Sequence, residues 1–193
     1  MYLVRLLRQV SEGLIRIERI ALIFLVASVA VFVLMNVGFR LFNVTIASAD
    51  ELAILSMTLA GFVGASLMLR ARTDPAVQIV YEIASEPIVR GLRMLVSTLA
   101  AAFGLILLWL NWRWFNLPEL IAAGFDVSTF EMSTFNFLYT ETTPVLGLPY
   151  FWFFLVMPWF ALTLSIHALA NLAEDLRLIE PRHLAQEFSQ TGD

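Results

Sequence analysis

Four apolar stretches, each long enough to cross a bilayer, constrain this chain more than any other feature. A helix needs about 20 apolar residues to span a hydrocarbon core of about 30 Å. The stretches lie at about residues 20–41, 52–69, 89–110 and 148–169. Of the 193 residues, 60% are hydrophobic and 15% are charged, an apolar excess too large for one soluble core. We therefore expect an all-α membrane protein in which residues 1–193 form a single integral-membrane domain with four transmembrane helices.

The distribution of arginine predicts the orientation of these spans. All 12 basic residues are arginine, and ten of them fall on one side of the expected membrane. These ten precede the first span, lie between spans two and three, or follow the fourth span: Arg5, Arg8, Arg16, Arg19, Arg70, Arg72, Arg90, Arg93, Arg177 and Arg182. The opposite side carries only Arg40 and Arg113. Because positively charged loops stay in the cytoplasm, both termini are expected to be cytoplasmic.

Composition also excludes several classes of function. A net charge of −4 and a pI near 5.2 leave no basic surface for nucleic acid, so no nucleic-acid partner is expected. The chain contains no cysteine, which removes disulfides, thiolate zinc sites and catalytic thiols. We expect neither a cofactor nor a metal ion, and we do not expect an enzyme.

The segment before the first span has two interpretations. Residues 1–19 carry leucine, isoleucine and arginine at helical spacing, which is typical of an amphipathic helix in the lipid headgroup layer or of a cytoplasmic extension of the first span. The sequence Ala47-Ser48-Ala49 resembles a signal-peptidase site. However, the region before it is too long for a signal peptide, and Arg40 would lie inside the cleavage region. We expect the first span to be retained.

Three further segments connect or follow the spans. Asp74 as an N-cap and Pro75 at the first helical position predict a short amphipathic helix on the membrane surface between spans two and three, ended or kinked by Pro87. Residues 113–147 form an outer loop whose phenylalanines are expected to enter the interface or to cover a partner protein. These are Phe115, Phe125, Phe130, Phe135 and Phe137. Residues 172–193 form a cytoplasmic tail.

The middles of the expected spans contain almost no ionisable residue, which disfavours a proton-coupled pump or antiporter. His167 lies toward the inner end of the fourth span, and a packing role is favoured over ligation. A bis-histidine haem is disfavoured because His183 lies beyond the membrane.

Pro149 is expected in the first turn of the fourth span, where proline is tolerated, whereas Pro158 should kink it.

A polar set at the outer ends of the first two spans comprises Arg40, Asp50 and Glu51. In one interpretation the two acids simply stabilise the positive N-terminus of the second helix. In the other, Arg40 pairs with one carboxylate and the second carboxylate contacts a partner subunit or a lipid headgroup. Exposed ion pairs at helix ends are common and weak, so the first interpretation is favoured.

Span two also carries small residues at helical spacing. One row consists of Ser56, Ala60 and Gly64, and a neighbouring row consists of Ala53, Gly61 and Ala65. Rows of small residues let another helix approach closely in a membrane. The sequence therefore predicts a packing face, and the partner helix could belong to this chain or to another.

At these residues the chain resembles the small membrane subunit of tripartite ATP-independent periplasmic (TRAP) transporters. The resemblance rests on Asp50–Leu52 at the entry to span two, on Gly61–Ala65 within it and on Arg70 at its exit. It also rests on Thr143–Pro149 before the last span and on Pro158 inside it. The four spans and the surface helix fit the same plan.

Two departures accompany the resemblance. The family commonly has a histidine and a β-branched residue just after the position of Arg70, where this chain has Thr73-Asp74-Pro75, so a family role for that histidine is in doubt. The outer segment is also longer than in compact members, which suggests additional contacts outside the membrane.

The resemblance implies a division of labour in the bacterial inner membrane. A periplasmic substrate-binding protein captures the substrate, usually an organic acid, and a large membrane subunit transports it with a sodium gradient. This chain would then brace the large subunit among membrane lipids without binding substrate. The residues expected at the subunit or lipid interface are Arg40, Asp50, Glu51, Ser56, Ala60, Gly61, Gly64 and Arg70. Two alternatives remain: an autonomous four-helix transporter of small solutes, and a membrane anchor or haem-bearing subunit of a redox complex.

Overall fold

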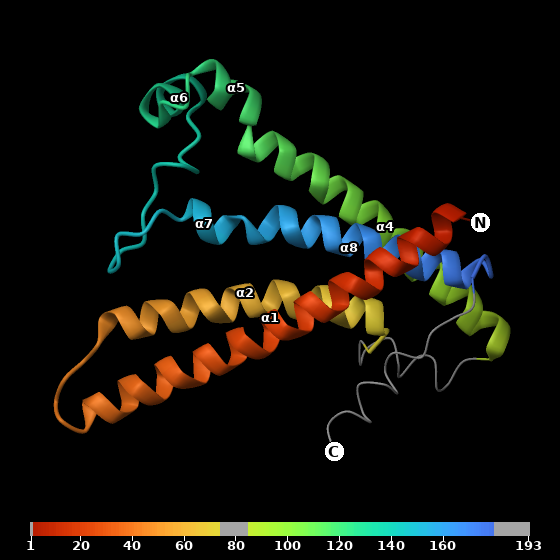
Figure 1. The fold of residues 1–193 in the computed structure, drawn as a ribbon, viewed down its shortest axis with the longest axis horizontal. Coiled ribbons are helices and arrows are strands. Elements are labelled where there is room, and N and C mark those ends of the chain that lie inside the picture. Colours follow the sequence, from red (N-terminus) through yellow and green to blue (C-terminus); the bar gives the residue numbers. More distant parts are fainter. Residues whose placement is uncertain (1, 74–84, 180–193) are drawn as a thin grey trace. The chain divides into compact units, whose positions relative to one another are not determined.

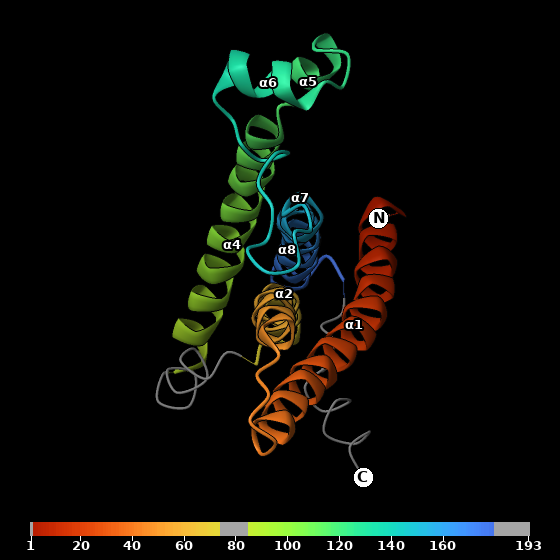
Figure 2. The same ribbon diagram turned by 90° about the vertical axis from the view of Figure 1, so that its left-hand side faces the viewer.

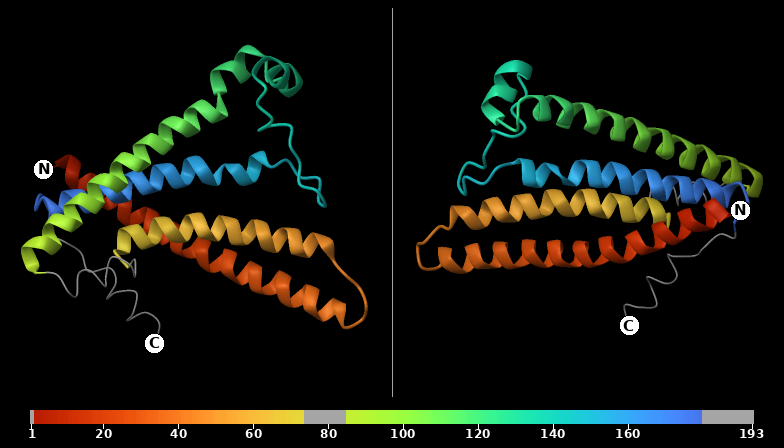
Figure 3. Two further views of the ribbon diagram at one scale, coloured as in Figure 1. Left: turned by 180° about the vertical axis from the view of Figure 1, so that it is seen from behind. Right: turned by 45° about the horizontal axis from the view of Figure 1, so that its top comes forward.

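A computed structural model describes residues 2–73 and 85–179, and helices dominate this part of the chain. Four of its helical segments are long and apolar enough to cross a membrane. The main helices in them, traced in Figure 1 and Figure 3, are α1 (Tyr2–Arg40), α2 (Ala47–Ala71), α4 (Glu86–Phe115) and α8 (Val156–Asp175). The described residues contain no β-strand, only an isolated bridge in the outer segment. These observations confirm the all-helical fold with four candidate spans.

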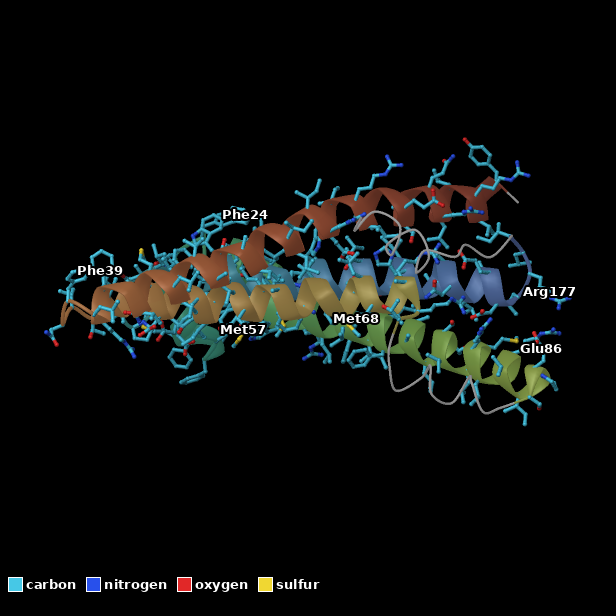
Figure 4. The ribbon with its side chains drawn as sticks, turned by 90° about the horizontal axis from the view of Figure 1, so that it is seen from below. Phe24, Phe39, Met57, Met68, Glu86 and Arg177 are labelled. Carbon is cyan, nitrogen blue, oxygen red and sulfur yellow. The ribbon has the colours of Figure 1, made fainter. Side chains whose placement is uncertain are left out.

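Helix α1 continues without a break from Tyr2 to Arg40. The N-terminal segment is thus helical and continuous with the helix that contains the first span, while its location relative to the membrane stays a prediction. Large apolar side chains cover the surface of its later turns, and Phe24 and Phe39 project away from the ribbon in Figure 4. Within the described chain, almost none of this apolar window is buried. A lipid or protein environment is needed to cover it.

The third and fourth spans differ in their bounds from the expected ones. The surface helix between spans two and three was expected mainly over residues 74–84, which lie outside the described residues. Helix α4 begins at Glu86 and holds Pro87 in its first turn, where a missing N–H needs no acceptor. Helix α8 ends at Asp175, six residues beyond the expected end of the span. This extension adds polar residues to the helix.

The start of the fourth span required a correction. Pro149 does not lie in the first helical turn; it lies in the isolated bridge with Thr142, and α7 (Phe151–Phe154) begins two residues later. Leu155, between α7 and α8, keeps helical backbone angles (φ −60°, ψ −18°), and Phe151–Asp175 is one apolar helical segment. Pro158 cannot donate to the carbonyl of Phe154 because it has no N–H. The kink expected at Pro158 stays a prediction.

The chain divides into two compact units, and each long helix contributes to both. Unit 1 contains Met1–Arg19, Val63–Ile106 and Phe160–Asp193. Unit 2 contains Ile20–Phe62 and Leu107–Trp159. Buried polar and charged side chains are concentrated in unit 1, whereas unit 2 contains a series of aromatic pairs, such as Trp114–Phe154 and Phe130–Tyr139.

In unit 2, the short helices α5 (Leu117–Ala122) and α6 (Val127–Thr134) lie across the end of α4, as Figure 2 shows. Phe130 on α6 is fully buried, and its ring packs edge-on against Tyr139 with centroids 5.3 Å apart. Phe115 is also buried, while the other three phenylalanines of the outer segment are exposed. The expectation that all five rings face lipid or a partner is therefore wrong for these two, which form an internal aromatic core.

Candidate functional site

Arg70, in the last turn of α2, is the centre of a buried polar cluster in unit 1. Only 1% of its side chain is exposed. Its Nε donates to Ser11 Oγ at 3.0 Å, its Nη1 to Asn171 Oδ1 at 2.6 Å and its Nη2 to Glu174 Oε1 at 2.7 Å. A buried guanidinium is tolerated only when it is paired and hydrogen-bonded. Arg70 thus connects the first turns of α1 with the last turns of α2 and α8.

The cluster continues from Ser11 through His167 to Glu18. The direction of its first hydrogen bond follows from the chemistry of arginine. Arginine can only donate, so Ser11 Oγ accepts from Arg70 and its own proton is available for His167 Nδ1 at 2.7 Å. His167 Nε2 lies 3.1 Å from Glu18 Oε2, and a carboxylate oxygen accepts there from the ring N–H.

A second set of contacts surrounds this chain of bonds. Arg72 donates to Asp175 Oδ1 at 2.8 Å and to the carbonyl of Asn171 at 3.0 Å. The other oxygen of Asp175 accepts from Ser97 on α4 at 2.7 Å. Asn171 also donates to the carbonyl of Leu69 at 2.8 Å, one of the carbonyls that a helix end leaves without an intrahelical partner. These bonds join α2, α4 and α8 through polar contacts.

Two carboxylate oxygens in the cluster are buried without a hydrogen bond: Glu18 Oε1 and Glu174 Oε2. Glu174 Oε2 lies 3.8 Å from Arg72 Nη2, so that charge still has an electrostatic partner. Unsatisfied buried polar atoms are uncommon and costly. No group of three or more metal-ligating side chains occurs among the described residues.

Sequence reasoning singled out Arg70 and His167 but did not connect them. A signal was present, because His167, Asn171 and Glu174 follow one another at four and three residues and so share one face of a helix. Ser11 and Glu18, seven residues apart, likewise share one face of α1. The signal was missed because the fourth span was taken to end near residue 169, which left Glu174 and Asp175 in the tail.

The outer polar set lies in unit 2, and its members have different partners. Arg40 Nη2 lies 3.6 Å from Asp50 Oδ2, and both side chains are largely exposed. Asp50 also accepts from the Asn36 amide. Glu51 accepts from the backbone N–H of Val145 at 3.2 Å and of Leu146 at 2.8 Å. The structure thus gives Glu51 partners in the loop before α7 of the same chain.

The small residues of α2 are only partly enclosed by this chain. Ser56 and Ala53 are buried, Ala60 and Gly64 are half-buried, and Gly61 is exposed, with no atom within 4 Å of the place that a Cβ would take. A different pair of helices makes the close approach. A Cβ at Gly104 on α4 would lie 2.5 Å from Ser165 Oγ and 3.1 Å from Ser165 Cα on α8. A tight packing contact therefore lies between α4 and α8, and sequence reasoning did not find it.

The four apolar helices and the motifs around Arg70 and the last span agree with a comparison to known families. The model of the family described as "Tripartite ATP-independent periplasmic transporters, DctQ component" matches residues 29–178. The chain belongs to this family. Searches of curated proteins and of solved structures find no significant match. The DctQ chain is thus a small membrane component of a TRAP transporter, a family of multi-subunit transport systems, and the resemblance inferred from its motifs is confirmed.

Proposed function

We propose that this DctQ chain is the non-catalytic subunit that braces the large membrane subunit of a sodium-driven, binding-protein-dependent transporter of organic acids. In this proposal the chain lies in the bacterial inner membrane with both termini in the cytoplasm, and it binds no substrate itself. The periplasmic binding protein and the large subunit supply recognition and transport.

The buried cluster around Arg70 is the observation that supports this proposal most. Its charged and polar side chains bond to one another across α1, α2 and α8. Such a network holds helices in one arrangement, because removing any member leaves a buried partner without its bond. A transport pathway needs ionisable groups that can exchange partners with a solute. Here Arg70 and Glu174 are buried and already paired with each other, which suits a scaffold better.

The exposed apolar surface of α1 supplies a second argument. Lipid can cover this surface, but so can the helices of a larger subunit. Gly61 on α2, whose Cβ position is open, adds a place where a foreign backbone could approach closely. Of the interface residues expected from the sequence, Gly61 and Gly64 remain our candidates for that contact, whereas Arg70 is buried and bonded within this chain.

Reconstitution tests this function directly. Proteoliposomes containing the chain alone are expected to show no sodium-driven uptake of radiolabelled carboxylates. Uptake should require the large subunit and the binding protein, and the two membrane subunits should remain associated in mild detergent. Uptake by the chain alone would contradict the proposal and favour the autonomous transporter. A Soret band in the purified protein would instead favour the redox-complex subunit.

Orientation can be tested separately because the chain contains no cysteine. A single cysteine placed at Gln9 in α1 should react with a membrane-impermeant maleimide only from the cytoplasmic side. The matched variant Ser128→Cys, exposed on α6, should react only from the periplasmic side. The reverse labelling pattern would overturn the proposed orientation without affecting the family assignment.

A further inference from the structure

The outer segment that follows α4 exposes large apolar side chains, although it lies outside the four expected spans. These side chains are Ile121 on α5, Phe125 between α5 and α6, Met132 on α6, and Phe135 and Phe137 after it. Their exposed fractions range from 49% to 81%. Exposed apolar side chains that gather in one short segment indicate a surface that contacts lipid or protein.

Two of these residues, Phe125 and Phe135, adopt the left-handed backbone conformation, with φ 62° and φ 54°. A bulky side chain is strained there, and glycine or asparagine is the usual choice. Burial within the chain does not compensate for this strain, because Phe125 is 68% exposed and Phe135 is 81% exposed. Backbone strain of this kind is typical of residues that contact a ligand or a partner. Both positions therefore indicate a contact outside the chain.

The charges and tryptophans of α4 give the depth of the outer segment. The 19 residues between Arg93 and Arg113 carry no charge. At 1.5 Å per residue they span about 28 Å, which matches a hydrocarbon core of about 30 Å. Trp109 and Trp112 are exposed near the end of this stretch, and the guanidinium of Arg113 lies 5.5 Å from the centroid of the Trp109 ring. Because tryptophan and arginine collect at the membrane boundary, Arg113 marks the edge of the hydrocarbon core.

The chain turns aside just beyond this boundary. Asn116, three residues after Arg113, has a left-handed backbone with φ 42°, and α5 begins at the next residue. Helices α5 and α6 then lie across the end of α4 instead of continuing along its axis (Figure 2). They therefore stay near the boundary, where interfacial helices insert their apolar side chains to a depth of about 5–10 Å.

The charge of the segment indicates which kind of lipid contact it makes. Residues 114–147 contain no basic residue and four carboxylates: Glu119, Asp126, Glu131 and Glu141. Attraction to anionic headgroups requires basic residues, whereas burial of apolar surface does not. We propose that the exposed apolar side chains of the outer segment insert between the headgroups and acyl chains of the leaflet at the Arg113 end of α4. The outer segment is then an interfacial anchor of unit 2.

Depth-dependent fluorescence quenching tests the proposal. Because the chain contains no cysteine, the variant Phe135→Cys carries an environment-sensitive fluorophore at a single site. The full-length protein is reconstituted into phosphatidylcholine vesicles, with and without the other subunits of its transporter. Some of the lipids carry a nitroxide on the upper acyl chain. The emission should shift to the blue, and quenching should exceed that of the control position at least about threefold, as insertion below the headgroups requires.

Ser133→Cys provides the matched control. Ser133 is also exposed on α6, but side chains two positions apart on a helix do not share a face. Phe125→Cys provides a second test position, so that the result does not depend on one variant, and it should behave like Phe135→Cys. If either phenylalanine position is quenched no more than Ser133, the proposal is overturned.

Two further comparisons distinguish this contact from other ones. Replacing half of the phosphatidylcholine with phosphatidylglycerol should change quenching by less than about twofold, because the segment has no basic residue to attract anionic lipid. Quenching that required phosphatidylglycerol would overturn the apolar contact. Adding the other subunits should leave quenching unchanged. If they abolish it, a protein covers this surface, and the assignment to lipid is overturned.

Discussion

The two units of this protein contain ion pairs of the same chemistry in opposite environments. In unit 1, Arg70 and Glu174 are 2.7 Å apart, and each is only 1% exposed. In unit 2, Arg40 and Asp50 are 3.6 Å apart, and their side chains are 60% and 49% exposed. Water cannot replace a lost partner in the buried Arg70–Glu174 pair, so losing one member of it is costly. Water can solvate either member of the exposed Arg40–Asp50 pair, so losing one member of it costs little. The contribution of a charged residue at a helix end to stability therefore cannot be judged until its burial is known.

The units also differ in how they are held together. Unit 1 is joined by hydrogen bonds between residues far apart in sequence, such as Ser11 and His167. Unit 2 also contains such a bond, from Leu146 to Glu51, but adds aromatic packing, with Tyr139 placed between Phe130 and Phe151. Polar networks fail when one member is lost, whereas apolar packing is less dependent on a single contact. The predictions below test this difference in order of expected effect.

The largest effect is expected at Arg70. Arg70→Ala should lower the free energy of unfolding by about 3–5 kcal/mol, because it removes the hydrogen-bonded counter-charge of the buried Glu174 carboxylate and leaves only Arg72, at 3.8 Å. Thermal unfolding in mild detergent measures the loss. Arg5→Ala, an exposed position on α1, is the control. The double variant Arg70→Met/Glu174→Met should be less destabilised than Arg70→Ala. If Arg70→Ala unfolds at the same temperature as the control, the network does not stabilise unit 1.

The next effect concerns packing between α4 and α8. Gly104→Leu should cost about 1–3 kcal/mol, because a side chain there collides with Ser165. Gly61→Leu is the matched control, since its Cβ position is open within this chain. The control should unfold normally and lose association with the large subunit if Gly61 lies at that interface. Equal destabilisation of the two variants would place a close contact at Gly61 instead.

A smaller effect is expected in the aromatic core of unit 2. The Tyr139 hydroxyl donates to the carbonyl of Phe115 at 2.6 Å, so Tyr139→Phe should cost about 0.5–1.5 kcal/mol. Burial raises the pKa of Tyr139 above its ordinary value of 10.0 because it disfavours the phenolate. The stability from the neutral hydroxyl is therefore present below pH 10 and is lost as pH rises through the folded pKa. Unfolding followed from pH 8 to pH 11 should show this loss in the unmodified chain and a smaller loss in Tyr139→Phe.

The smallest effect is expected at Arg40. Arg40→Ala should change the free energy of unfolding by at most about 1 kcal/mol, because water screens its pair with Asp50. Raising the ionic strength should remove most of this difference. Arg40→Lys serves as the charge-preserving control. A loss comparable to that of Arg70→Ala would show that the two pairs are not separated by burial.

Much of the fold could be predicted from sequence, because a membrane-spanning helix is recognised from consecutive apolar residues within one segment. The spans followed from runs of apolar residues, each long enough to cross the bilayer. The ends of the spans were less accurate, since Glu174 and Asp175 are charged and belong to α8 only because Arg70 and Arg72 pair with them. The burial of Phe130 was missed for a similar reason, as it depends on Tyr139 in a later loop.

By itself the sequence determined that this chain lies in a membrane, how many helices can cross it and to which transporter family it belongs. These properties depend on the solvation of each segment and on short motifs, which are readable residue by residue. The tertiary structure decided which polar groups pair, which small residues touch and which aromatic rings are enclosed. Such choices depend on residues from different segments of the chain, which for Ser66 and Thr163 are 97 positions apart, and their distance in space is not contained in any local pattern.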